Sequence, residues 1–238
     1  MTTATQQTTQ SAIEYPDDDG EPMSDNTLQY NWMVLIKGYL EFLFLDNLNV
    51  FVAGNLLWYP VEGKPTIRTA PDVMVAFGRP NGRRGSYKQW EEANIAPQVV
   101  FEILSPGNRP DEIERKFEFY EKYGVEEYYV YDPDDGTLAG WLRRRDHLEK
   151  VADMAGFVSP WLNIRFELGN GPNNLQIIGP DGESFQTHAQ DIQQRRAERR
   201  RADEERQLKE AERRRADEER QRAERYAAKL RELGIEPD

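Results

Sequence analysis

The chain has 238 residues, contains no cysteine and carries a formal net charge of −12. The lack of cysteine excludes disulfides, thiolate metal sites and cysteine nucleophiles, and the two histidines, His147 and His188, are too far apart for a zinc-binding motif. Residues 191–238 hold 15 Lys/Arg and 14 Asp/Glu, so the net charge of residues 1–190 is −13. An acidic body repels nucleic acid at long range, so DNA binding here requires local basic patches or bound metal.

Residues 1–25 are polar and acidic, which predicts a disordered leader. The first residues lack the basic and apolar regions of a secretory signal. No apolar run reaches the roughly 18 residues that a membrane span needs. Together with the absence of cysteine, these features lead us to expect a cytoplasmic protein that does not enter a membrane.

A helix is predicted from about residue 27 to 46, because apolar side chains recur there at helical spacing and Asn26 or Thr27 suits its N-terminus. Three short β-like runs follow, at 50–59, 70–77 and 98–104. Between the last two runs lies a long polar excursion rich in glycine and arginine. Such excursions within compact domains are usually functional or mobile.

A second helix is predicted from Pro110 to Tyr123, because Pro110 suits the first helical position and Gly124 suits the end. Further strands are predicted at 127–131, 137–142, 164–167 and 175–178, with a hairpin turn at 132–136. This order of strands and helices predicts an α/β fold. We expect one domain at 26–188.

The region 189–238 has a different composition and predicts a long charged helical tail. The octapeptide RRADEERQ occurs at 200–207 and again at 214–221, a repeat of two heptads. Arginine and glutamate lie three and four residues apart, which stabilises an isolated helix. The heptad seam is mostly alanine, so two alternatives remain: a solvated single helix or a weak coiled coil.

Two carboxylates lie within otherwise apolar strands. Side chains alternate between the two faces of a strand. Along 71–77, Asp72 points to the face away from Val73, and along 99–104, Glu102 points to the face away from Phe101. Strands this apolar are covered on both faces, where a carboxylate is costly to bury without a partner. Two such carboxylates on neighbouring strands therefore need a cation between them.

The second predicted helix offers a cation. Lys116 lies about 60° from the centre of that helix's inward stripe, so its ammonium group can turn toward Glu102, and Glu112 borders the same side. Carboxylates that hold Mg²⁺ beside a lysine that positions water form a hydrolytic site. The alternative is a plain buried ion pair between Lys116 and Glu102.

These residues resemble a known family. Pro71-Asp72 followed by Glu102-Ile103-Leu104 resembles the PD-(D/E)xK nuclease signature with its lysine displaced. The stretches APDVMVAFGRP, GSYKQWEE, PQVVFEILSPGNR and KFEFYEKYGVEEYYVYDPDDG, with the terminal LRELGIEPD, are similar to the Uma-two family of putative restriction endonucleases, abundant in cyanobacteria. The resemblance covers about residues 25–190. It implies a restriction-endonuclease-like fold, which is a mixed sheet flanked by helices.

The resemblance also implies roles for individual residues. Asp72 and Glu102 correspond to the metal ligands and Lys116 to the catalytic lysine, while the Ile103 carbonyl is a further candidate ligand for Mg²⁺ or Mn²⁺. The expected function is metal-dependent hydrolysis of DNA, with a homodimer as the expected assembly. The alternative is a non-catalytic interaction protein with a degenerate nuclease fold that acts through its C-terminal helix.

The sequence departs from the family pattern at three positions. Leu104 occupies the in-line lysine position, so the site depends on the lysine of the following helix. Glu112 and Asn55 occur where aspartate is common in the family, and these two residues, with Glu41 of the first helix, are candidate accessory residues of the metal site.

One basic cluster in the body also contains aromatic residues. Arg83, Arg84 and Lys88 lie near Tyr87 and Trp90, a mixture that suits contacts with the DNA backbone and bases. The alternative is a solvated loop anchored by its tryptophan.

Overall fold

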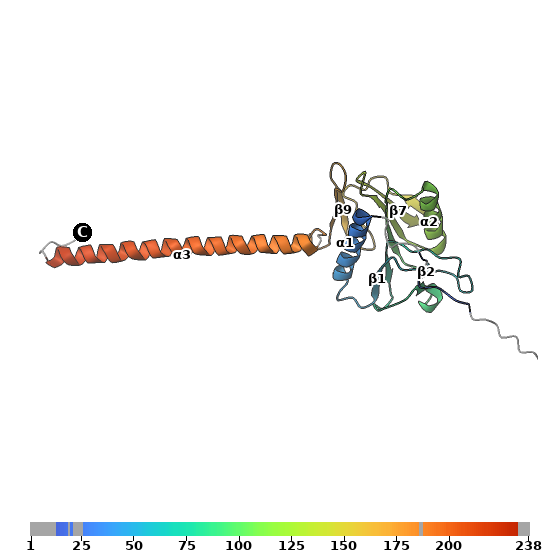
Figure 1. The fold of residues 1–238 in the computed structure, drawn as a ribbon, viewed down its shortest axis with the longest axis horizontal. Helices are drawn as coiled ribbons and strands as arrows, with labels where there is room; N and C mark the ends of the chain where they lie inside the picture. The colour runs from blue at the N-terminus through green and yellow to red at the C-terminus, as the bar shows by residue number, and fades with distance from the viewer. Residues whose placement is uncertain (1–12, 19, 21–25, 186–187, 233–238) are drawn as a thin grey trace, which may run out of the picture. The chain divides into compact units, whose positions relative to one another are not determined.

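The computed structural model describes residues 13–18, 20, 26–185 and 188–232 (Figure 1). The chain divides into two units, Met1–Phe185 and Gln186–Asp238. In the part of the chain that the structure describes, no helix combines the length and the apolar character that crossing a membrane requires.

A six-stranded sheet forms the centre of the first unit, in the order β1-β3-β5-β6-β7-β8. Its strands are β1 Val50–Gly54, β3 Val73–Phe77, β5 Val99–Ile103, β6 Glu127–Asp132, β7 Thr137–Arg144 and β8 His147–Lys150. Strands β5 and β6 pair in parallel, whereas every other neighbouring pair is antiparallel. The sheet is therefore mixed, and the predicted α/β class is confirmed.

Two smaller sheets accompany the central one. Strand β2 Trp58–Tyr59 pairs in parallel with β4 Tyr87–Lys88, and β9 Arg165–Leu168 pairs antiparallel with β10 Leu175–Ile178. The predicted single strand at 50–59 is thus two strands, because the chain turns at Asn55, whose φ of 47° lies in the left-handed region. The predicted excursion at 78–96 contains β4 and a short 3₁₀ helix, Gln89–Glu91.

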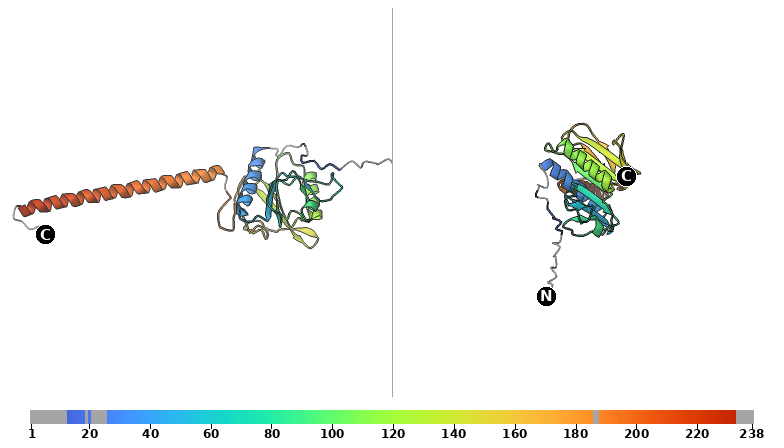
Figure 2. Two further views of the ribbon diagram at one scale, coloured as in Figure 1. Left: turned by 90° about the horizontal axis from the view of Figure 1, so that it is seen from below. Right: turned by 90° about the vertical axis from the view of Figure 1, so that its right-hand side faces the viewer.

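The helices α1 Thr27–Leu43 and α2 Pro110–Tyr123 cover opposite faces of the central sheet (Figure 2). Helix α1 begins where Asn26 Oδ1 accepts a hydrogen bond from the Gln29 amide at 2.8 Å, and α2 ends at Gly124, whose φ of 94° favours glycine. One core forms between α1 and the sheet and includes Ile36 and Val75, and a second forms between α2 and the sheet and includes Tyr120 and Val100. The strands are therefore buried on both faces, as their apolar sequences predict.

Residues 13–18 contact the body of the protein. The Tyr59 hydroxyl donates a hydrogen bond to the Pro16 carbonyl at 2.6 Å, and the Ser86 hydroxyl donates to Asp17 Oδ1 at 2.9 Å. The Tyr15 ring lies 5.0 Å from that of Trp90. The expectation of a disordered leader is therefore wrong for this segment, because its aromatic side chain packs on the domain. Residues 1–12, 19 and 21–25 lie outside the described residues.

The second unit contains one helix, α3 His188–Glu232, 45 residues long (Figure 1). Its described side chains are nearly all exposed, and ion pairs at helical spacing link them. Examples are Lys209 Nζ to Glu205 Oε1 at 2.6 Å and Arg214 Nη2 to Glu210 Oε1 at 3.1 Å. Exposed pairs of this kind contribute little each, about 0.3–0.5 kcal/mol, and salt screens them.

A chain that ends at residue 187 should keep the thermal stability of the full chain. We expect the melting temperature to change by less than about 2 °C, because exposed charged pairs add little to the stability of the domain. The helicity of a peptide covering 188–232, measured by circular dichroism, should fall as salt is raised. A large drop in the melting temperature of the truncated chain would contradict this, and helicity that rises with peptide concentration would indicate a coiled coil.

Candidate active site

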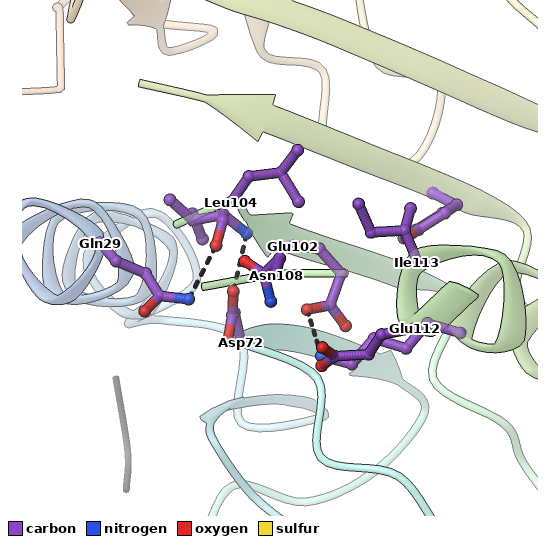
Figure 3. A pocket seen from close by; sticks show the side chains of 10 residues that line it. Gln29, Asp72, Glu102, Leu104, Asn108, Glu112 and Ile113 are labelled. Carbon is purple, nitrogen blue, oxygen red and sulfur yellow. Dashed lines mark hydrogen bonds and ion pairs between the residues drawn. The ribbon is translucent and has the colours of Figure 1, made fainter. Parts of the chain in front are cut away.

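The pairing of β3 with β5 brings two carboxylates together. Val73 lies opposite Phe101 in this antiparallel register, so Asp72, which directly precedes β3, lies beside Glu102 on the face that α2 covers (Figure 3). Asp72 is 7% exposed and Glu102 is 4% exposed. The strand alternation therefore places both carboxylates at one pocket, lined by Gln29, Asp72, Glu102, Ile103, Leu104, Asn108, Glu112, Ile113, Lys116 and Tyr128.

Burial changes the acidity of Asp72. Removal from water and then repulsion from the neighbouring Glu102 carboxylate raise the pKa of its carboxyl group from 3.8 to about 8, and the positive charge of Lys116 offsets only part of the rise. The Ile103 amide donates a hydrogen bond to Asp72 Oδ2 at 2.7 Å, which opposes part of the shift. Asp72 therefore holds a proton at neutral pH as long as no divalent metal ion lies beside it.

Glu102 is bound by two donors from α2. Lys116 Nζ lies 2.8 Å from Glu102 Oε2 and forms an ion pair with it, and the Tyr120 hydroxyl donates a hydrogen bond to Oε1. Lys116 and Tyr120 are four residues apart, so both project from one side of the helix toward the same carboxylate. The structure thus brings together the three residues that the sequence analysis placed at the centre of the site.

Lys116 is a permanent cation in this setting. Burial by itself lowers the pKa of its ammonium group, but Glu102, Asp72 and Glu112 together outweigh burial and raise the pKa above its ordinary value. The side chain of Lys116 is 23% exposed and so borders both the pocket and solvent. A lysine of this kind contributes positive charge and hydrogen-bond donors, and it does not act as a general base.

The carbonyl of Ile103 has a partner that the sequence analysis missed. Gln29 Nε2, from the first turn of α1, donates a hydrogen bond to this carbonyl oxygen at 2.8 Å (Figure 3). Gln29 is 6% exposed and lies three residues before Trp32 on the buried stripe of α1. A polar residue on that apolar stripe was the available signal. A carbonyl oxygen has two lone pairs, so it can accept this hydrogen bond and still bind another ligand.

The accessory candidates separate into two groups. Glu112 lines the pocket, as the helix pattern predicts. Glu41 does not join it, because it forms an exposed ion pair with Lys37 at 2.6 Å and lies about 18 Å along α1 from Gln29.

Asn55 forms a backbone hydrogen bond near the site. Its amide donates a hydrogen bond to the Asp72 carbonyl oxygen at 3.2 Å, and its side chain is not among those that line the pocket. Its left-handed backbone conformation explains the residue type, because asparagine adopts that region more readily than most residues do.

The structure does not support Arg84 as a DNA contact. Its Nε lies 2.5 Å from Glu92 Oε1, its Nη2 lies 3.2 Å from Glu92 Oε2, and its guanidinium group lies 3.9 Å from the centre of the Phe51 ring. Arg84 therefore neutralises a buried carboxylate, which its sequence neighbours did not indicate. Lys88 lies 3.7 Å from Glu91, and Arg83 is exposed.

The donor set of the pocket fits a hard divalent cation. Among the described residues no group of three acidic or histidine side chains could hold a metal, so a cation here would rest on Asp72, Glu102 and the free lone pair of the Ile103 carbonyl. Magnesium is commonly held by one or two carboxylates, with water and phosphate as its other ligands. Such a cation would also remove the repulsion that raises the pKa of Asp72.

Comparison with known proteins found a family model and solved structures that match the chain. A family model, Uma2, described as putative restriction endonuclease, matches residues 4–158. A solved structure of a putative nuclease belonging to DUF820 from Anabaena variabilis ATCC 29413 is 16% identical, covers 57% of this chain and 72% of that chain, and has a TM-score of 0.42. No curated protein matches the chain. The region matched by the family model includes Asp72, Glu102 and Lys116.

Proposed function

Because the chain belongs to the Uma2 family of putative restriction endonucleases, we propose that it hydrolyses phosphodiester bonds of DNA with the help of Mg²⁺ or Mn²⁺. One observation carries the proposal: a pair of buried carboxylates, Asp72 and Glu102, lies beside a protonated lysine at one pocket. An isolated pair of buried carboxylates is unfavourable, and a divalent cation makes it favourable.

Each residue has a defined task in this proposal. Asp72 and Glu102 would hold the cation, which would polarise a phosphoryl oxygen and activate a water molecule. Lys116 stays protonated, so it stabilises negative charge that develops on the phosphate and orients the attacking water. Gln29 holds the Ile103 carbonyl at the edge of the same pocket through its hydrogen bond, and this carbonyl oxygen would be a further ligand if a cation were bound.

The acidic body limits how DNA can approach. Residues 1–190 carry a net charge of −13, so long-range attraction does not draw DNA to the domain. A bound cation and exposed basic side chains such as Arg83 would supply the local positive charge that phosphate contacts require.

One observation favours the non-catalytic alternative. Lys116 and Tyr120 already donate to both oxygens of Glu102, so the ion pair is complete without a metal. A site of this kind would stabilise the fold and leave the interaction role to the C-terminal helix. Metal binding by the carboxylate pair distinguishes the two functions, because the nuclease requires it and the non-catalytic protein does not.

A plasmid-nicking assay with Mg²⁺ or Mn²⁺ tests the proposal. The wild-type chain should convert supercoiled plasmid to the nicked form, and Glu102→Gln should reduce nicking to background because it removes a ligand charge. The matched control is Glu118→Gln, which makes the same change at an exposed position of α2 and should nick as the wild type does. Equal nicking by all three proteins, or none by the wild type, would contradict the proposal.

A further inference from the structure

A buried hydroxyl group at the pocket has no hydrogen-bond partner among the residues that the structure describes. Tyr128 lies on β6, opposite Val100 of β5, and is 1% exposed. Within the described residues its hydroxyl group makes no hydrogen bond. Buried polar groups without partners are destabilising and rare in native proteins, so each one calls for an explanation.

The packing of the Tyr128 ring does not require the hydroxyl. The ring contacts Tyr120 at 5.1 Å, Trp141 at 5.3 Å and Phe117 at 6.2 Å between ring centres. A phenylalanine would make the same contacts without burying an oxygen. Neighbouring Tyr129 differs, because its hydroxyl donates to Glu127 Oε2 at 3.0 Å. The Tyr128 hydroxyl therefore needs a hydrogen-bond partner that the described protein atoms do not supply.

The position of Tyr128 indicates what it binds. Its side chain lines the same pocket as Asp72, Glu102 and Lys116, and the two carboxylates act on it electrostatically. Burial and these charges raise the pKa of Tyr128, so the hydroxyl remains a donor at physiological pH. Because the hydroxyl group is this deeply buried, the phosphate backbone of DNA does not reach it, and a partner for it in the pocket has to be as small as a water molecule.

We propose that Tyr128 positions a water molecule that bridges its hydroxyl group to the carboxylates of Asp72 and Glu102. A buried water needs two to four polar partners, and these three side chains supply them. When the pocket holds a divalent cation, the same water belongs to the hydration shell of that cation; this second part rests on the proposed function. Tyr128 is thus a positioning residue that acts on metal binding through the water.

The test compares Tyr128→Phe with Tyr129→Phe by calorimetric titration of Mn²⁺. Tyr128→Phe should weaken Mn²⁺ binding about tenfold, the usual effect of removing a group that orients a metal's ligands. Tyr129→Phe is the matched control, because it removes a buried hydroxyl from the next residue of β6, on the opposite face. It should lower the melting temperature and leave Mn²⁺ affinity unchanged.

Two results would overturn the inference. One is unchanged Mn²⁺ affinity together with a raised melting temperature in Tyr128→Phe, since deleting an unused buried hydroxyl stabilises a protein. The other is a crystal structure of the metal-free protein without water at hydrogen-bond distance, about 3 Å, from the Tyr128 hydroxyl. If the wild type binds no Mn²⁺, the proposed function fails, and the crystal structure alone decides whether Tyr128 holds a water.

Discussion

We expect Lys116→Met to lower the rate of DNA cleavage by about 10²–10³-fold, the effect of removing one group that stabilises charge in the transition state. The same variant should be less stable than wild type when metal is removed, by about 3–5 kcal/mol, because Glu102 would lose the ammonium group that lies 2.8 Å from it. Added Mg²⁺ should restore most of this stability, since a cation on the carboxylates replaces the lost charge.

Thermal denaturation with chelator and with Mg²⁺, together with plasmid nicking, measures these effects. Lys122→Met is the matched control, because Lys122 is exposed near the end of the same helix and lies over the ring of Tyr123, 5.4 Å from its centre. This control should match the wild type in both assays. Full cleavage by Lys116→Met would show that the lysine is not catalytic. Instability that Mg²⁺ does not relieve would point to a purely structural ion pair.

Local periodicity was enough to predict the centre of the site. Period-two alternation assigned Asp72 and Glu102 to one face of two neighbouring strands, and the 100° period of the second helix directed Lys116 toward them. These patterns depend on residues near in sequence, and the antiparallel register of β3 and β5 confirms the adjacency of the two strands. The catalytic roles of these residues remain predictions.

Long-range packing determined the rest of the site. Gln29 and Tyr120 come from α1 and α2, and nothing in their local sequence specifies the atom to which each one donates; nor does it show that the Tyr128 hydroxyl of β6 lies buried at the same pocket. Their contacts follow from how the two helices are placed on the sheet. Only the polar character of Gln29 on an apolar stripe gave a signal in advance.

Two segments make specific contacts that their composition does not indicate. The basic and aromatic residues near Arg84 suggested a DNA-binding loop, but the guanidinium group neutralises Glu92, which is 9% exposed. The polar leader suggested disorder, but the ring of Tyr15 packs against Trp90. In both cases one specific contact outweighs the average character of the segment, and composition does not report single contacts.

We expect Asp72→Asn to stabilise the metal-free protein at pH 8 and to have little effect near pH 4. The pKa of Asp72 rises from 3.8 to about 8 on folding, so the folded protein keeps a proton that the unfolded chain releases in this range. Wild-type stability is therefore full below pH 4 and declines as the pH rises toward 8, by up to about 1.4 kcal/mol per pH unit. Asparagine resembles the protonated carboxyl and does not titrate, so the variant avoids this loss.

Urea denaturation between pH 4 and pH 8, with chelator and then with Mn²⁺, measures this difference. With chelator, the advantage of Asp72→Asn over wild type should grow with pH, whereas Asp111→Asn, a change at an exposed position of α2, should give a nearly constant difference. With Mn²⁺ at pH 8 the order should reverse, because the cation binds the ionised pair of the wild type and stabilises only that protein. A constant difference with chelator would mean that Asp72 titrates normally. A missing reversal would mean that the carboxylate pair does not hold the metal.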